Sequence, residues 1–240
     1  MKALVIGAAG HLGKACVEEL LASGSEVYAA DLSKPSVAGA QAIELDVTNL
    51  ASVKSKISEI EKSGPIEALI YAAGVNFTGY VDQTDWQQYQ KLMQINLQGA
   101  FHVGAALQES MRSTRRDFSS VFISSTAGLK GEAGGSIYVA TKFGLIGFVQ
   151  SFASEIAQFG GRANAVCPGN VDSPMLRKLA GQIAARQSKT EEQVLGELAG
   201  SSAFNRLIDP REVARTCAWL LSSNSSGISG QTIVVDGPVA

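Results

Sequence analysis

Apolar strand-like segments alternate with helix-period segments along the whole chain, and this alternation limits the fold more than any other feature. Strand-like runs occupy Ala3 to Ile6, Glu26 to Ala30, Ala42 to Leu45, Ala68 to Ala72, Val121 to Ile123, Ala163 to Cys167 and Thr232 to Val235. Helical periodicity covers His11 to Ala22, Leu50 to Lys62, Trp86 to Arg112, Ser136 to Phe159 and Pro210 to Leu221. Parallel strands need crossovers that pack on the sheet, so this order indicates βαβ units. We predict an α/β fold in which a doubly wound parallel sheet of about seven strands carries helices on both faces.

Composition and charge narrow the function classes. The chain has 240 residues, 45% of them hydrophobic, and we expect one domain over residues 1–240, since no repeat or linker divides it. The net charge is -2, and the short basic run from Arg112 to Arg116 is typical of a solvated helix end, so we expect no nucleic-acid partner. No apolar run reaches the length of a membrane span, and the N-terminus starts directly with a strand-like run, so we expect a cytoplasmic protein without a membrane partner. The three cysteines are far apart, which favours buried thiols over a disulfide framework or a metal site.

A glycine-rich turn follows the first predicted strand and opens the first predicted helix. It reads Gly7-Ala8-Ala9-Gly10-His11-Leu12-Gly13. Glycines there let the backbone turn tightly and approach a pyrophosphate, whose charge a helix N-terminus favours. The same glycines would also suit a tight turn with no ligand. The pattern indicates a Rossmann-type dinucleotide site, with His11 either donating toward phosphate or facing solvent.

An acidic residue at the end of the second predicted strand bears on the choice of cofactor. Asp31 follows the glycine turn at the distance at which an acid accepts the ribose hydroxyls of NAD, and its charge would repel the 2′-phosphate of NADP. We therefore predict NAD as the cofactor. Asp31 could instead be a turn or capping residue. Asp46, after the third strand, could reach an adenine amino group or cap the helix that starts near Asn49.

The residue types for proton transfer lie between Ser125 and Lys142. Tyr138 and Lys142 are four residues apart in a predicted helix, so their side chains share a face. A nearby ammonium favours the phenolate and lowers the pKa of a tyrosine. Ser125 follows a buried strand, at the edge where open α/β sheets bind ligands. A tyrosine and lysine at this spacing also occur by chance on solvated helices, so the pattern gains weight only from the rest of the chain.

Taken together, these pieces resemble the short-chain dehydrogenase/reductase family over nearly the whole chain. Further similar pieces are Leu45-Asp46-Val47, Ala72-Ala73-Gly74, Ile95-Asn96-Leu97, Pro168-Gly169 and the ending from Gly230 to Gly237. The resemblance implies that Tyr138 is the acid/base, that Lys142 lowers its pKa and holds the nicotinamide ribose, and that Ser125 orients the substrate carbonyl. It also implies that Asn96 anchors a water in a proton relay, that Asp46 and Val47 bracket adenine, and that Val171 and Ser173 meet the carboxamide. The cofactor-binding set that we expect is Gly7, Gly10, His11, Leu12, Gly13, Asp31, Asp46, Val47, Ala73, Gly74, Tyr138, Lys142, Pro168, Gly169, Val171 and Ser173.

Several positions depart from the family pattern. Ile6 and His11 replace a threonine and a glycine of the usual turn, and Ser173 replaces a threonine. Tyr71 stands where the family usually has an asparagine that ties strands together, so that bond must be made otherwise or lost. His102 has no histidine or acid at ligand spacing, which favours a structural role.

The predicted function is an NAD-dependent oxidoreductase that interconverts a secondary alcohol and a ketone. The segment 172–205 is a candidate lid, a helical pair with a capping-like Ser188-x-x-Glu191 at its joint. Polar residues Asn76, Asn170, Gln182 and Arg186 favour a small-molecule substrate such as a polyol, sugar derivative or hydroxy acid. An NADPH-dependent 3-oxoacyl reductase and a non-catalytic nucleotide-binding regulatory protein stay open as alternatives. The resemblance also implies a homodimer or homotetramer paired through the helices from Trp86 to Arg112 and Ser136 to Phe159.

Overall fold

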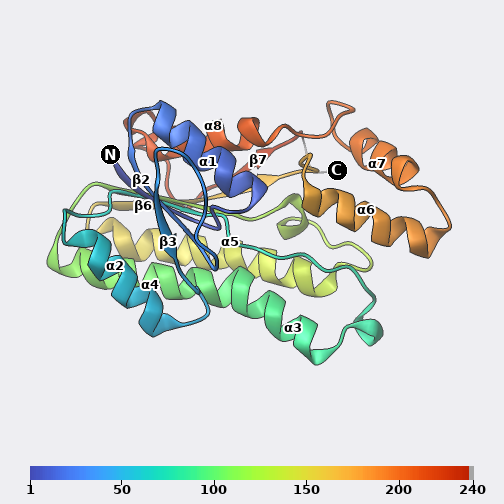
Figure 1. The fold of residues 1–240 in the computed structure, drawn as a ribbon, viewed down its shortest axis with the longest axis horizontal. Coiled ribbons are helices and arrows are strands. Elements are labelled where there is room, and N and C mark those ends of the chain that lie inside the picture. Colours follow the sequence, from blue (N-terminus) through green and yellow to red (C-terminus); the bar gives the residue numbers. More distant parts are fainter. Residues whose placement is uncertain (238–240) are drawn as a thin grey trace.

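One parallel sheet contains every strand of residues 1–237, the part of the chain that the computed structural model describes (Figure 1). The strands are β1 (Lys2–Ile6), β2 (Glu26–Asp31), β3 (Gln41–Glu44), β4 (Ala68–Tyr71), β5 (Phe118–Ile123), β6 (Gly161–Pro168) and β7 (Thr232–Val235). Their order in the sheet is β3-β2-β1-β4-β5-β6-β7, so the predicted doubly wound parallel sheet is confirmed. The chain winds outward from β1 to β3 and then returns to β4, beside β1. Such a reversal opens a crevice at the carboxyl ends of the central strands.

Helices cover both faces of the sheet. On one face lie α1 (His11–Ala22) and α8 (Pro210–Leu221), and on the other α2 (Leu50–Glu61), α4 (Gly99–Ser113) and α5 (Ser136–Ala157) (Figure 1). Three more helices lie beyond the carboxyl ends of the strands, namely α3 (Trp86–Leu92), α6 (Pro174–Gln187) and α7 (Glu191–Gly200). None of the helices in residues 1–237 is long and apolar enough to span a bilayer.

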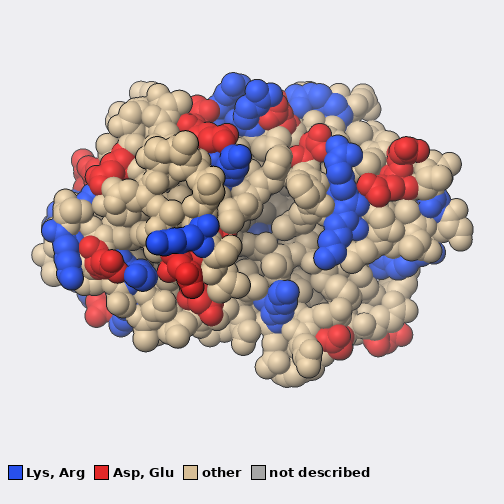
Figure 2. Space-filling view, viewed as in Figure 1, with Lys and Arg blue, Asp and Glu red and all other residues tan. Residues whose placement is uncertain are grey.

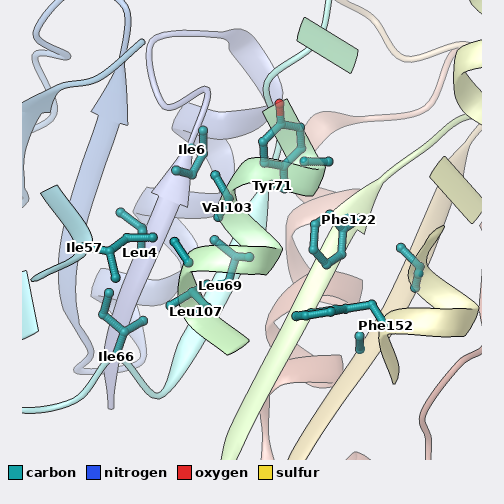
Figure 3. Packing of buried hydrophobic residues seen from close by; sticks show 14 of the residues in the cluster. Leu4, Ile6, Ile57, Ile66, Leu69, Tyr71, Val103, Leu107, Phe122 and Phe152 are labelled. Carbon is teal, nitrogen blue, oxygen red and sulfur yellow. The ribbon is translucent and has the colours of Figure 1, made fainter. Parts of the chain in front are cut away.

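The core explains why the central strands are apolar on both faces. On the side of α2, α4 and α5, Leu4, Leu69 and Phe122 of the sheet pack against helix side chains (Figure 3). The ring of Phe122 meets those of Phe148 and Phe152 edge-on, with centroids 5.6 and 6.0 Å apart. A second apolar cluster fills the space under α1 and α8. Because helices bury both faces, the strands read as continuous apolar runs rather than alternating ones.

The helix predicted from Trp86 to Arg112 is confirmed, but it is not a regular α-helix throughout. Helix α3 ends at Leu92, the π-helical turn Met93–Gln98 follows, and only then does α4 begin. Asn96 lies in this turn, fully buried, and its side chain bonds to groups outside the helix. A π turn is a costly local widening that occurs most often at functional sites, and hydrophobic periodicity carries no signal for it.

The joint of the helical pair in 172–205 also differs from the prediction. Ser188 is not an N-cap, because its backbone is left-handed (φ 56°) and it terminates α6. The capping box of α7 is instead formed by Thr190 and Gln193. The two extra residues let the chain reverse before α7 starts. Figure 1 shows α6 and α7 side by side at the right end of the molecule, where Ala180, Ala184 and Val194 form a small apolar cluster of their own.

Tyr71 replaces the expected strand-tying bond with a different one. Its side chain is fully buried at the end of β4, and its hydroxyl donates to the carbonyl oxygen of Ile95 at 2.5 Å. The bond therefore joins the sheet to the π-helical turn that holds Asn96. A buried carbonyl that loses its donor keeps the cost of desolvation without compensation.

We predict that Tyr71→Phe lowers the free energy of unfolding by about 1–3 kcal/mol, since it leaves the Ile95 carbonyl without that donor. Urea denaturation followed by circular dichroism measures this change. Tyr89→Phe, which changes a half-buried tyrosine of α3, is the matched control and should stay within about 0.5 kcal/mol of the unmodified chain. Equal stability of the two variants would show that the Tyr71 hydroxyl does not hold the turn.

Candidate functional site

The residues singled out by sequence converge at the carboxyl ends of β1, β4, β5 and β6. This is the crevice that the strand order creates. Figure 2 shows a hollow near the middle of this face of the molecule, with lysine and arginine side chains on several sides of it. By comparison with Figure 1, the hollow lies between α6 and the helices on the α5 side of the sheet.

Lys142 is the most deeply buried charged group of this set. Only 4% of the residue is exposed, and its Nζ donates to the carbonyl oxygen of Ile123 at 2.9 Å. The backbone of Lys142 is tied to the same strand end, because the Ser124 hydroxyl donates to the Lys142 carbonyl at 3.0 Å. Burial lowers the pKa of Lys142 to about 8, which still leaves the ammonium largely protonated at neutral pH.

Tyr138 lies one helical turn before Lys142, as predicted, and the lysine Nζ is 5.6 Å from the centroid of its ring. The electrostatic balance, however, differs from the expectation of a lowered pKa. Burial raises the pKa of Tyr138 to about 12, and a hydrogen bond from the Ser125 hydroxyl only partly opposes this. Desolvation of the phenolate outweighs the field of a lysine that stands over the ring. Without bound cofactor, Tyr138 is therefore a neutral proton donor.

Asn96 holds the loop after β4 rather than presenting a free amide. Its Oδ1 accepts from the Val75 N–H at 2.8 Å, and its Nδ2 donates to the Val75 carbonyl at 2.9 Å and to Thr141 Oγ1 at 3.1 Å. The Thr141 hydroxyl in turn donates to the carbonyl of Tyr138 at 2.7 Å. Asn96 thus connects the π-helical turn to the first turns of α5.

The glycine turn is built on two close approaches. Gly7 has a left-handed backbone (φ 83°), and a Cβ atom there would lie 2.4 Å from the Ala73 nitrogen. A Cβ at Gly13 would lie 2.0 Å from the Gly7 carbonyl oxygen. Gly10 caps the start of α1, where Leu12 is half-buried and His11 is exposed. The turn therefore brings bare backbone and a helix N-terminus to the crevice, which is the arrangement that a pyrophosphate requires.

Asp31 lies beside this turn at the end of β2. Its Oδ2 accepts from the Ala9 N–H at 2.9 Å, and its Oδ1 accepts from the Leu32 N–H at 2.7 Å. Asp31 therefore bonds to the bend that follows β2 but caps none of the described helices, and each carboxylate oxygen retains acceptor capacity for a hydroxyl. Within the described residues no basic side chain forms an ion pair with Asp31. Lys34 is exposed and lines a separate hollow of about 670 Å³ next to β3 and α2.

Asp46 and Val47 lie beyond β3. Asp46 does not cap the helix: Asn49 is the N-cap of α2, and Asp46 Oδ1 instead accepts from the N–H and the hydroxyl of Thr48. Val47 is buried, and its carbonyl is 2.9 Å from Nδ1 of His102. His102 therefore has a structural partner, and it fixes the segment expected to flank adenine.

The remaining expected cofactor residues follow β4 and β6. Ala73 is the residue whose backbone nitrogen lies close to Gly7, and Gly74 follows it in the chain. A Cβ at Gly74 would be 3.6 Å from both Asn96 Oδ1 and Lys142 Nζ, so the missing side chain leaves space between these two polar groups. The Asp236 side chain lies against Gly169, where a Cβ atom would be 2.0 Å from Asp236 Oδ2.

Val171 and Ser173 differ in what they can offer. The Val171 side chain is buried in the apolar cluster under α1 and α8, so only its backbone can face the crevice. Its bridge to Ile208 uses the Asn170 carbonyl and the Asp172 N–H, which directs the N–H and carbonyl of Val171 to the opposite side. Ser173 caps α6 and lines a hollow of about 470 Å³ with His11 and Arg177.

Sequence reasoning missed Glu132 and Cys167. Both raise the pKa of Tyr138: Glu132 by its negative charge, and Cys167, whose own pKa burial raises, only in its thiolate form. Cys167 is fully buried at the end of β6, and Glu132 lies against Gly135, the N-cap of α5. No motif identifies either residue, because both reach the site only through folding. No set of histidine, cysteine or acidic side chains in residues 1–237 is arranged to hold a metal ion.

We predict that Gly7→Ala destabilises the chain more than Gly24→Ala. Both glycines have left-handed backbones, which costs an alanine about 1–3 kcal/mol, but a Cβ at Gly24 meets no atom within 4 Å. Only the Gly7 variant must also push β4 and the glycine turn apart. Urea denaturation of the two variants measures the difference, and indistinguishable midpoints would contradict the close approach.

Comparisons with known proteins agree with this geometry. The model of a family described as enoyl-(acyl carrier protein) reductase matches residues 7–239. The oxidoreductase UcpA of Escherichia coli K12 is 37% identical over 201 residues, covering 82% of this chain and 74% of that protein. The 3-oxoacyl-(acyl-carrier-protein) reductase FabG of Thermotoga maritima is 31% identical, covering 98% of this chain and 95% of that protein.

Two solved structures are similar over nearly the whole chain. The aldohexose dehydrogenase of Thermoplasma acidophilum has a TM-score of 0.90 at 32% identity, covering 99% of this chain and 93% of that one. The sorbitol-6-phosphate 2-dehydrogenase of Erwinia amylovora has a TM-score of 0.93 at 27% identity, covering 99% of both chains. The fold, the family match and the relatives lead to one conclusion: the chain belongs to the short-chain dehydrogenase/reductase family of oxidoreductases.

Proposed function

We propose that the chain is an NAD(H)-dependent oxidoreductase that interconverts a secondary alcohol and a ketone, with Tyr138 as the acid/base. The observation that carries this proposal is the convergence of the Tyr138 phenol, the Ser125 hydroxyl and the buried Lys142 ammonium at the end of β5. A phenol, a hydroxyl and an ammonium around one point suit proton exchange with a single substrate oxygen. Asn96 supports the arrangement from the π-helical turn.

The residues present fit a nicotinamide dinucleotide, the cofactor class of this family. Gly7, Gly10 and Gly13 leave room for backbone to approach a pyrophosphate, and Asp31 offers carboxylate oxygens to ribose hydroxyls. His11 and Leu12 would border the pyrophosphate, Asp46 and Val47 the adenine, and Ala73, Gly74, Pro168, Gly169, Val171 and Ser173 the nicotinamide end. When bound, the cofactor accepts or supplies the hydride.

The chain itself would supply orientation and the proton. In ketone reduction the neutral Tyr138 would donate its proton to the carbonyl oxygen, while the Ser125 hydroxyl holds that oxygen in place. In alcohol oxidation the phenolate would accept the alcohol proton. Lys142 stabilises the phenolate, and the space above Gly74 between Lys142 and Asn96 would admit a water that passes the proton onward. The segment 172–205 would cover the substrate as a lid.

We predict that Tyr138→Phe reduces turnover by about 10² or more, because it removes the positioned proton donor, and leaves NADH affinity within a few fold. NADH formation from NAD with hexitols, hexitol phosphates and 3-hydroxy acids measures turnover, and NADH fluorescence measures affinity. Tyr89→Phe is the control. Undiminished turnover of the Tyr138 variant would exclude it as the acid/base.

A second candidate is a 3-oxoacyl reductase, favoured by the FabG relatives that cover nearly the whole chain. The proton chemistry would be the same, so the cofactor distinguishes the two candidates best. Asp31, with no ion-paired base among the described residues, favours NAD over NADP, whose additional phosphate it would repel.

We predict that the unmodified chain binds NADH at least about tenfold more tightly than NADPH, and that Asp31→Asn reduces this ratio, since the repelling charge is gone. Fluorescence titration with both nucleotides needs no substrate. Tighter binding of NADPH by the unmodified chain would favour the reductase candidate instead.

We propose further that two copies of the chain pair through α4 and α5. Phe101 and Phe143 are 54% and 45% exposed on these helices, and Gly147, where a Cβ would meet no atom within 4 Å, gives α5 a low surface on which a second helix can pack. Exposed aromatic side chains of this kind are typical of interfaces.

We expect light scattering to give at least a dimer mass at micromolar concentration, and Phe101→Glu to shift it toward the monomer. A monomeric unmodified chain would refute the pairing.

A further inference from the structure

Arg186, near the C-terminal end of α6, bonds to the loop that follows β4. Its Nη2 donates to the Thr78 hydroxyl at 2.6 Å, and that hydroxyl donates to the Gly134 carbonyl at 3.1 Å. The same carbonyl accepts from the Gly79 N–H at 2.8 Å. Gly134 precedes Tyr138 by four residues, just before α5 begins. Arg186 therefore connects α6 to the two loops that lead into the site.

The loop at Gly134 is shaped to admit the guanidinium. Gly134 has a left-handed backbone (φ 81°), and a Cβ there would be 3.4 Å from Nη1 and 3.9 Å from Nη2 of Arg186. Any side chain at this position would therefore touch the guanidinium. Because Gly134 has no side chain, the space beside Nη1 of Arg186 is left open on the side of the two loops.

The charge of Arg186 is not neutralised by a carboxylate in residues 1–237. Two other basic residues of the segment are paired, Arg177 with Asp172 at 2.8 Å and Lys189 with Glu197 at 2.7 Å. The bond to Thr78 uses one of the five N–H donors of the guanidinium. Helix α6 has three basic residues and no acidic one.

We propose that Arg186 binds an anionic group of the substrate, a phosphate or a carboxylate, at the mouth of the site. This inference rests on the proposed function, because it names the substrate class of the same site. A guanidinium holds either anion through two parallel hydrogen bonds, which an uncharged alcohol cannot form. Thr78 and Gly134 hold Arg186 in place before the substrate arrives.

The position of Glu132 indicates the orientation of the substrate. Its carboxylate lies against Gly135 at the start of α5 and raises the pKa of Tyr138. An anion next to the reacting carbon would meet this negative charge. The anionic group therefore lies on the Arg186 side, and the alcohol or ketone lies on the Tyr138 side.

The test uses matched substrate pairs that differ by one anionic group. Calorimetry on the protein saturated with NADH compares sorbitol with sorbitol 6-phosphate, and 2-butanol with 3-hydroxybutyrate. NADH formation from NAD is then measured with the same four compounds. The variants are Arg186→Gln, Arg186→Lys, Thr78→Val, which removes the hydroxyl but keeps the arginine, and Lys178→Gln, which removes an equal charge from α6.

We expect the anionic member of at least one pair to bind about 10- to 100-fold more tightly, and Arg186→Gln to remove this preference. Arg186→Lys should restore part of it, Thr78→Val should weaken it less than Arg186→Gln does, and Lys178→Gln should retain it. A preference confined to one pair identifies phosphate or carboxylate as the group. If neither pair shows a preference that depends on Arg186, the inference is wrong. If Thr78→Val and Arg186→Gln weaken charged and uncharged members equally, Arg186 is only a structural contact and the inference is also wrong.

The two proposals fail in different ways. Oxidation of the four compounds without an anionic preference would leave the oxidoreductase proposal intact and overturn the role of Arg186. Anionic preference in binding, with no NADH formed from any compound, would support Arg186 and count against the oxidoreductase proposal.

Discussion

The buried ammonium of Lys142 is the constraint on which the site depends. A buried ammonium with only 4% of its residue exposed must be compensated. Here the Ile123 carbonyl accepts a hydrogen bond from Lys142 Nζ, and the Tyr138 ring faces the ammonium. The lowered pKa of about 8 corresponds to a preference against the charged form on the order of 3 kcal/mol. Strand β5 and helix α5 must therefore meet in one register, which the Ser124 bond to the Lys142 backbone fixes. The same register places Ser125 and Tyr138.

Burial shifts the pKa of Tyr138 in the opposite direction from that of Lys142. We expected a nearby lysine to lower the pKa of the phenol, and that expectation considered charge but not desolvation. In the cofactor-free chain desolvation dominates and raises the pKa of Tyr138 to about 12. Glu132 and Cys167 act in the same direction. The fold thus keeps Tyr138 protonated until another positive charge enters. In our proposal the oxidised nicotinamide supplies that charge, so phenolate would form only when NAD is bound.

The sequence alone predicts the sheet, its parallel direction and the convergence of Ser125, Tyr138 and Lys142, because strand ends and helical spacing follow from local pattern. It does not predict the π-helical turn at Asn96 or the bond from Tyr71 to Ile95, since both depend on partners far away in the chain. The joint before α7 was misplaced because Ser188 adopts a left-handed conformation that its residue type does not announce. Glu132 joins the site only when folding brings its loop near Tyr138, and only the folded structure shows the contact of Arg186 with Thr78.

The most direct test of this account is the ionisation of Tyr138 with and without NAD. Subtracting the ultraviolet titration of Tyr138→Phe from that of the unmodified chain isolates the tyrosinate absorbance of this residue. The account predicts a pKa of about 12 for the free chain. It also predicts a fall toward about 7, the range that acid–base catalysis at neutral pH requires, when NAD is bound. A Tyr138 pKa that NAD leaves unchanged would contradict the account.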